Sequence, residues 1–221
     1  MTEYRIEVKL ITESIFGSGY SIPSEVDLEV VTDEYGLPYM KAKTFKGNFR
    51  EAMEEIVRLV GKEKYGDIVD KLLGKGEAGL DQWKTLKFSD MRLAKNIRAA
   101  IEKAVSEGKI EPQEIKEALT EIRSFTSVDE EGSSKKGSLR HLRVIKKGLI
   151  FEVDLHTERN LPEEELGILA MTTSYLRHIG TMRTRGKGEI QCCLLEKVEG
   201  EFVDCTNKYI DRFFEGVRTG A

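Results

Sequence analysis

The chain has 221 residues, with 39 acidic and 35 basic residues and a formal net charge of −4. This length allows one sizeable domain, or a compact domain with a large insertion. No run approaches the roughly 20 apolar residues needed to cross a bilayer, and the first ten residues alternate instead of resembling a signal peptide. We therefore expect a cytoplasmic protein with no membrane partner.

The three cysteines are Cys192, Cys193 and Cys205. An odd number without an export signal argues against a disulfide framework. Because no Cys-x-x-Cys pair or Cys/His set has metal-ligand spacing, a zinc site is not expected either. Core positions are the interpretation that remains for these thiols.

Basic residues gather in two segments that contain no acid, although the chain as a whole is acidic. Residues 132–147 hold six lysines and arginines, and residues 177–188 hold four more. Such a distribution suits a basic track along a nucleic-acid backbone even in a protein of negative net charge. A solvated charged surface is the alternative.

Periodicity predicts the regular elements of the first half. Residues 4–11 alternate as a half-buried strand, and residues 26–31 are predicted to form a short strand. Apolar residues recur at helical spacing over 44–60, and Gly61 is a helix stop. Two further helices are predicted over 89–106, capped by Ser89 or Asp90, and over 111–122, opened by Pro112.

The second half is predicted in the same way. Residues 124–143 are predicted to form a protruding hairpin and residues 149–155 a strand that pairs with 139–145. The last three predicted elements are a helix over 162–179, a strand over 189–198 and a helix over 206–217.

A single α+β domain over 1–221 accounts for this order, with a helical lid inserted at about 62–122 and the hairpin at about 124–143. Without the lid, the elements follow as strand, helix, strand, strand, helix, strand. This is the ferredoxin-like order, which RNA-recognition modules share.

The segment 180–188, GTMRTRGKG, is suited to binding phosphate. Its glycines allow close backbone approach, and its arginines supply charge-assisted contacts. A dinucleotide fingerprint is excluded because the order here is helix, loop, strand. A plain tight turn remains an alternative.

The segment 43–50, KTFKGNFR, opens the first predicted helix. Helix N-termini attract anions, and Lys46 and Arg50 share a helix face at four-residue spacing. The alternative is a surface helix whose phenylalanines pack and whose basic residues are solvated.

Five motifs, each weak alone, resemble in this order the RAMP-superfamily backbone subunits of type III CRISPR effector complexes, in particular the small single-domain type. They are 17–19, 26–47 with Gly36-Leu37-Pro38 and Lys46-Gly47, 72–74 with 86–90, Arg123 with 129–139, and 180–188. The resemblance covers nearly the whole chain.

The resemblance implies that copies stack along CRISPR RNA, that the glycine-rich loop and the first helix grip its backbone, and that other effector subunits join them. Target RNA pairs with the guide, and the hairpin wedges between its bases. RNA-binding positions implied in this chain are Lys43, Lys46, Arg50, Arg123, Arg140, Arg143, Arg183, Arg185, Gly186, Lys187 and Gly188.

The resemblance also implies that an acid near the kinked hybrid cuts target RNA with Mg²⁺ or another divalent cation. Asp27 is the matching catalytic residue and metal ligand, where it would position or activate the 2′-hydroxyl. Asp33 is closer to the turn and is predicted to cap it. A copy without nuclease activity, acting as a guide-RNA scaffold, is the third possibility.

Other residues and protein classes are constrained by the same sequence. His141 lies in the hairpin segment and either contacts RNA or is inert, and Phe125 and Leu139 either contact bases or pack the hairpin. A CRISPR RNA-processing endonuclease with an early histidine base is disfavoured, because no histidine precedes His141. An RNP motif, a P-loop and HExxH are absent.

Overall fold

The computed structural model describes residues 3–74, 85–126, 135 and 137–219. Its main sheet contains β1 (Tyr4–Leu10), β2 (Leu86–Phe88), β6 (Ile150–Thr157), β7 (Ile190–Val198) and β8 (Glu201–Asp204). These strands lie in the order β2-β6-β1-β7-β8, and each neighbouring pair is antiparallel.

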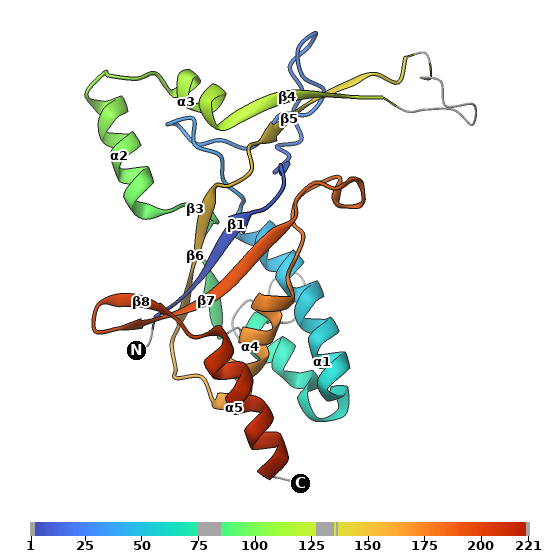
Figure 1. The fold of residues 1–221 in the computed structure, drawn as a ribbon, viewed down its shortest axis with the longest axis vertical. Helices are drawn as coiled ribbons and strands as arrows, with labels where there is room; N and C mark the ends of the chain where they lie inside the picture. The colour runs from blue at the N-terminus through green and yellow to red at the C-terminus, as the bar shows by residue number, and fades with distance from the viewer. Residues whose placement is uncertain (1–2, 75–84, 127–134, 136, 220–221) are drawn as a thin grey trace.

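Helices cover one face of this sheet (Figure 1), and α1 (Ala42–Leu73) and α4 (Glu163–Tyr175) pack against each other there. The terminal helix α5 (Thr206–Thr219) lies against α4. In β1, Ile6 and Val8 point into the core, as their alternation predicts. Burial of this apolar stripe on the sheet and helices is the main source of stability for the domain.

The opposite face of β1 and β6 carries ion pairs. Arg5 binds Asp154 at 2.8 Å and Glu152 at 3.0 Å. Lys95 adds a second cation on Asp154 at 2.9 Å. RNA-recognition modules use aromatic side chains on this face, so these strands lack the stacking surface of that family.

The order β1-α1-β2-β6-α4-β7, with β2-β6-β1-β7 in the sheet, is ferredoxin-like and confirms the predicted fold class. The predicted partner of the 149–155 strand was wrong. Strand β6 pairs with β1, β2 and β3 (Arg92–Leu93), whereas residues 140–145 pair with 120–125. Strand β8 was not predicted.

The first helix is interrupted where the sequence predicts its end. Gly61 has φ 130° and ψ 89°, which is not helical, and the helix resumes to Leu73 in a new direction. Only glycine adopts this backbone readily, so the residue acts as a hinge point between two helical pieces. Residues 75–84, which follow α1, lie outside the described residues.

The range 62–122 contains strands as well as the predicted helices. Helix α2 (Lys95–Ser106) begins later than residue 89, because residues 86–88 and 92–93 pair with β6 instead. Asp90 is therefore not the cap of α2. Its carboxylate accepts a hydrogen bond from the Ala42 amide at 2.9 Å and so satisfies a free N–H at the start of α1.

The hairpin forms a second sheet that projects from the domain (Figure 1). Strand β4 (Thr120–Phe125) pairs with β5 (Arg140–Ile145), and α3 (Pro112–Leu119) leads into it. The helix predicted over 111–122 therefore ends three residues early. The residues between the strands, including 127–134, lie mostly outside the described part of the chain.

Two smaller expectations can be compared with the structure. All three cysteines are free; Cys192 and Cys205 are buried, whereas Cys193 is half-buried, so the core prediction is wrong for that residue. Among the described residues, no helix is both long and apolar enough to span a membrane.

Candidate nucleic-acid interface

A groove of about 320 Å³ lies where three segments meet. The segments are residues 15–18 after β1, the start of α1, and the first residues of the glycine-rich loop, which comprises residues 180–188. The lining includes Gly17, Ser18, Lys41, Thr44, Asn48, Gly180 and Thr181. Small residues allow a polymer backbone to approach closely, and the start of a helix favours negative charge.

The glycine-rich loop has a left-handed backbone at several residues. Gly180, Gly186 and Gly188 have φ between 71° and 83°, and Met182 also has positive φ. The Gly188 amide donates to the Glu13 carbonyl at 2.8 Å, and the Thr181 amide donates to the Ile15 carbonyl at 3.1 Å. The loop is thus fastened to the segment that follows β1.

The structure brings the two predicted phosphate-binding segments together. Arg183 donates to the Asn48 side chain at 3.4 Å and lies 3.7 Å from the carboxylate of Glu51, both on α1. Arg185 and Gly186 are exposed at the tip of the loop, while Gly188 is buried. Lys43 is exposed in the first turn of α1, and Lys46 is half-buried one turn later.

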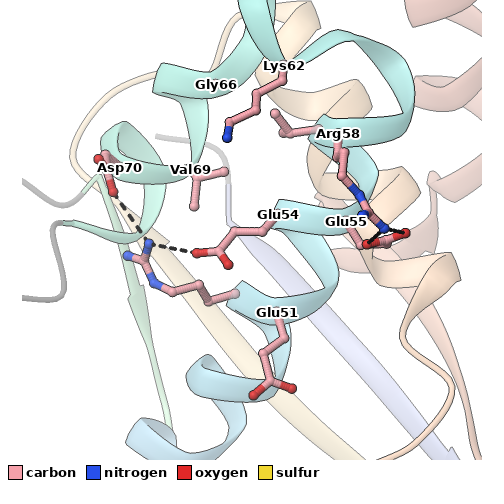
Figure 2. Close-up of a pocket in the computed structure, with 10 residues that line it drawn as sticks. Glu51, Glu54, Glu55, Arg58, Lys62, Gly66, Val69 and Asp70 are labelled. Atoms are coloured by element: carbon pink, nitrogen blue, oxygen red, sulfur yellow. Dashed lines mark hydrogen bonds and ion pairs between the residues drawn. The ribbon is translucent and has the colours of Figure 1, made fainter.

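Arg50 lies on a different surface from this groove. Its guanidinium lines a pocket formed by the two pieces of α1 (Figure 2), and it lies 3.4 Å from Asp70 and 3.6 Å from Glu54. It also donates to the Gly74 carbonyl. The kink at Gly61 folds Asp70 back over the first piece of the helix, which gives Arg50 a structural contact that helical spacing could not indicate.

Glu13 joins the hairpin to the glycine-rich loop. Its carboxylate accepts hydrogen bonds from Arg123 of β4, at 3.2 Å from Nε, and from Lys187. Burial by itself raises the pKa of Glu13, but these two cations outweigh it and lower the pKa to about 2. Two residues predicted to bind RNA therefore already share one carboxylate.

We expect Glu13→Gln to weaken this junction and to destabilise the protein by about 2 kcal/mol at neutral pH, because hydrogen bonds to a charged group are lost. In the folded protein the pKa of Glu13 lies below the usual 4.5. The full difference in unfolding free energy between the native protein and Glu13→Gln is therefore present above pH 4.5. It declines as the pH falls toward 2. Urea unfolding of both proteins between pH 7 and pH 3 measures this, and an equal difference at every pH would contradict it.

Arg143 is buried, with 5% of its side chain exposed. Its Nε donates to Glu29 at 2.9 Å, and it also contacts Thr120 and Glu25. Glu29 in turn binds Lys116 of α3 at 3.1 Å. The structure thus assigns the Arg143 guanidinium to an internal ion-pair network, where carboxylates take the place that a phosphate was predicted to occupy.

Residues 26–31 do not form the predicted strand, because their backbone hydrogen bonds are divided between two partners. The Asp27 amide donates to the His141 carbonyl of β5 at 2.7 Å, whereas the Glu29 amide donates to the Tyr20 carbonyl at 2.9 Å. The segment thus bridges the hairpin and the loop after β1 instead of joining one sheet.

Asp27 lies beside the start of β5, near the outer end of the paired strands, with its carboxylate partly exposed. Oδ2 accepts the His141 amide at 2.7 Å, and Oδ1 is 3.4 Å from Arg140. The His141 hydrogen bond is the main reason that the pKa of Asp27 is lowered, with Arg140 contributing further. An ionised carboxylate of low pKa is a weak base, so its chemistry is to orient groups or bind a cation.

Asp33 is buried and caps the turn, as predicted. Its Oδ1 accepts the amides of Tyr35 and Leu37 at 3.0 and 3.1 Å, while Oδ2 binds Arg98 at 2.8 Å. Only 4% of the side chain is exposed. This carboxylate is consumed by structural contacts, which leaves Asp27 as the accessible acid of the segment.

The remaining hairpin residues are divided between packing and exposure. His141 Nδ1 lies 3.0 Å from Ser124 Oγ on the paired strand. Phe125 is half-buried beneath Lys187, whose Nζ is 5.8 Å from the ring centroid. Leu139 is 56% exposed. Leu139 is therefore the apolar side chain of the two that is available to another molecule.

Sequence reasoning did not identify Glu13, Glu29 or Asn48 as parts of this region. The one available signal was the segment 10–40, which contains six acids and no lysine or arginine. Such a segment beside two basic ones indicates internal pairing, although it does not show which acid meets which base.

The chain is also similar to known proteins. The family model described as the RAMP superfamily matches residues 7–191, whereas no curated protein matches the chain significantly. A chain in the cryo-EM structure of the Type III-B Cmr-beta bound to cognate target RNA has a TM-score of 0.60 and 15% identity, covering 87% of this chain and 96% of its own.

A chain in the cryo-EM structure of the apo state of Type III-B Cmr-beta has a TM-score of 0.61 and 16% identity, covering 92% of this chain and 98% of its own. At these identities the likeness establishes the fold. The family match spans most of the domain, from β1 into β7, and includes the groove, the hairpin and the glycine-rich loop. The chain therefore belongs to the RAMP superfamily.

Proposed function

We propose that this chain is a guide-RNA-binding backbone subunit of a type III CRISPR interference complex and that it cleaves complementary target RNA at regular intervals. The observation that carries the proposal is the placement of Asp27, an ionised and accessible acid fixed to the start of β5 in a projecting hairpin. Membership of the RAMP superfamily and the fold shared with Cmr-beta chains support the type of complex.

Guide RNA would bind along the groove between the start of α1 and the glycine-rich loop. Lys41 and Gly180 line this groove, and Lys43, Arg183 and Arg185 supply positive charge in the adjoining parts of α1 and the loop. These contacts are to phosphate and sugar and do not depend on base identity. Specificity then comes from pairing between guide and target, as in other guided systems.

Cleavage would depend on how the target strand is held beside a single carboxylate, and not on a cluster of catalytic side chains. The hairpin holds Asp27 rigidly, and a target strand kinked beside it would present its own 2′-hydroxyl in line with the scissile phosphate. Asp27, ionised at neutral pH, would orient that hydroxyl.

A divalent cation such as Mg²⁺ is part of the proposal. Such ions take about six oxygen ligands and are often bound by one or two carboxylates with phosphates and water. Asp27 provides one carboxylate, and among the described residues no group of three or more potential ligands gathers. RNA oxygens and water would therefore complete the coordination, and the ion would supply charge stabilisation at the phosphate.

The proposed partners are CRISPR RNA, target RNA, further copies of this chain and the other effector subunits. The alternative function is a guide-RNA scaffold in the same complex that does not cleave. One observation favours it: both oxygens of Asp27 already have partners within the protein, His141 and Arg140.

We expect Asp27→Asn to abolish regularly spaced cuts, with a loss of at least about 100-fold in rate, while guide and target binding persist. Asparagine keeps an oxygen that can accept the hydrogen bond from the His141 amide, so the contact between residue 27 and β5 should remain intact. The assay uses the assembled complex with CRISPR RNA and labelled complementary RNA, with Mg²⁺ or with EDTA. The matched control is Asp211→Asn on the exposed side of α5.

Binding without cuts by the native complex would support the scaffold alternative. If the Asp27→Asn complex still cleaves, Asp27 is not the catalytic residue. If the native complex cleaves in EDTA, cleavage does not require a divalent cation. A purified complex that contains no CRISPR RNA would overturn the proposed function itself.

A further inference from the structure

Tyr20 is the most exposed large apolar side chain of the described residues, with 77% of its surface accessible. It lies near the tip of the loop 17–26, between the Gly17-Ser18-Gly19 motif and Asp27. Single exposed apolar residues are ordinary on a protein surface, whereas loops held by a rigid scaffold commonly carry binding residues.

The backbone that carries Tyr20 is held in place on both sides. The Tyr20 amide donates to Ser18 Oγ at 3.1 Å, and its carbonyl accepts the Glu29 amide at 2.9 Å. Beyond it, Ile22 and Val26 exchange two hydrogen bonds of 2.7 and 2.9 Å. The ring is therefore presented by an ordered turn, which lowers the entropy lost when it makes a contact.

The same hydrogen bonds place Tyr20 in the neighbourhood of the proposed cleavage site. Glu29, which fixes its carbonyl, is two residues from Asp27, and Asp27 is bonded to the start of β5 at His141. Leu139, also exposed, lies two residues before His141. Figure 1 shows this N-terminal loop beside β4 and β5.

Charge decides which part of RNA this loop can contact. Residues 17–26 contain one acid, Glu25, which pairs with Arg143, and no lysine or arginine, so the loop offers no cation of its own to a phosphate. An attractive contact to RNA must then be made through a base face. Base stacking on an aromatic ring suits a target of any sequence, because every base has a π-face.

We propose that Tyr20 is a base-stacking residue that holds a target-RNA nucleobase beside Asp27. This inference rests on the proposed function, because it requires target RNA beside Asp27 and the start of β5. Stacking on one aromatic residue contributes about 1–3 kcal/mol per base, which corresponds to about 5- to 150-fold in affinity. The occupant that competes with this proposal is a neighbouring copy of the chain, with Tyr20 buried in the contact.

The test uses assembled complexes that all carry Asp27→Asn, so that intact target RNA can be followed whether or not the chain is a nuclease. Tyr20→Ala is compared with Tyr20→Phe, which keeps the ring. The matched control is Phe214→Ala, since Phe214 is 44% exposed on α5, far from the hairpin. The target carries 2-aminopurine, whose fluorescence falls when it stacks, at each position in turn.

We expect Tyr20→Ala to weaken target binding about 5- to 150-fold and to raise the fluorescence at regularly spaced positions, while Tyr20→Phe and Phe214→Ala behave as the parent. Unchanged binding and fluorescence in Tyr20→Ala would overturn the stacking role, and so would a complex with fewer copies of the chain. Neither result affects the interpretation of the Asp27 cleavage test, because that test is carried out with native Tyr20.

Discussion

Replacing Gly188 with alanine is expected to destabilise the protein by more than about 3 kcal/mol and to release guide RNA from the assembled complex. Gly188 has φ 76°, and a Cβ built there would lie 2.0 Å from the carbonyl oxygen of Ile179. That oxygen belongs to the backbone and cannot move aside cheaply. The Gly188 amide and carbonyl also bond Glu13 and Ile179, so the whole loop must shift.

Gly186→Ala is the matched control for this substitution. Gly186 has nearly the same φ, 71°, yet a Cβ there meets no heavy atom within 4 Å. Alanine at residue 186 therefore carries only the conformational cost of a left-handed residue, about 1–2 kcal/mol. Denaturant unfolding and the RNA content of the purified complex measure both effects. Equal losses for the two variants would show that steric contact with Ile179 is not the cause.

Arg143→Met is expected to cost about 3–5 kcal/mol of unfolding free energy, because it leaves the carboxylate of Glu29 buried with one cation fewer. Glu29→Met should be similarly damaging, since it leaves the Arg143 guanidinium buried. The double variant should lose less than the sum of the two, as expected for residues in direct contact. Urea unfolding of the four proteins gives the coupling energy.

The neighbouring Arg140 provides the control for charge alone. Its side chain is 65% exposed and its contact with Asp27 is long, at 3.4 Å. We expect Arg140→Met to change the unfolding free energy by no more than about 0.5 kcal/mol. If Arg140→Met and Arg143→Met were equally destabilising, burial of the Arg143 network would not be the reason for its effect.

The Arg143 network also affects the candidate site. Arg143 pairs with Glu29, two residues from Asp27, and the Arg143 amide donates to the carbonyl of Leu28 at 3.1 Å. Variants that break the ion pair should therefore lower target cleavage along with stability, although they contain an intact Asp27. Under the proposed function, Arg143 is a positioning residue and not a contact to RNA.

The ferredoxin-like core was predictable because its main elements carry strong local periodicity. Strands β1, β6 and β7 alternate over seven to nine residues, and α4 buries one apolar residue after another. The shortest strands were not predictable. Strands β2 and β3 have three and two residues, too few for any period, and their extended form is imposed by pairing with β6.

The candidate site divides in the same way. The glycine-rich loop and the start of α1 could be selected from residue type and order, and the structure places them against each other, whereas Asp27 came from the family resemblance. The roles of Arg50, Arg123 and Arg143 could not be separated, because charge does not reveal its partner. Arg143 and Glu29 are 114 residues apart in the chain, and only the folded hairpin brings them into contact.

By itself, the sequence determined the apolar periods of the long strands and helices and the glycines at left-handed positions, since these properties depend on a residue and its near neighbours. The tertiary structure alone decided which arginines face solvent and which face carboxylates, how residues 26–31 share their hydrogen bonds, and that Tyr20 stands exposed beside Asp27. The reason is that ion pairs and exposure depend on distances between side chains, which exist only after distant segments have packed.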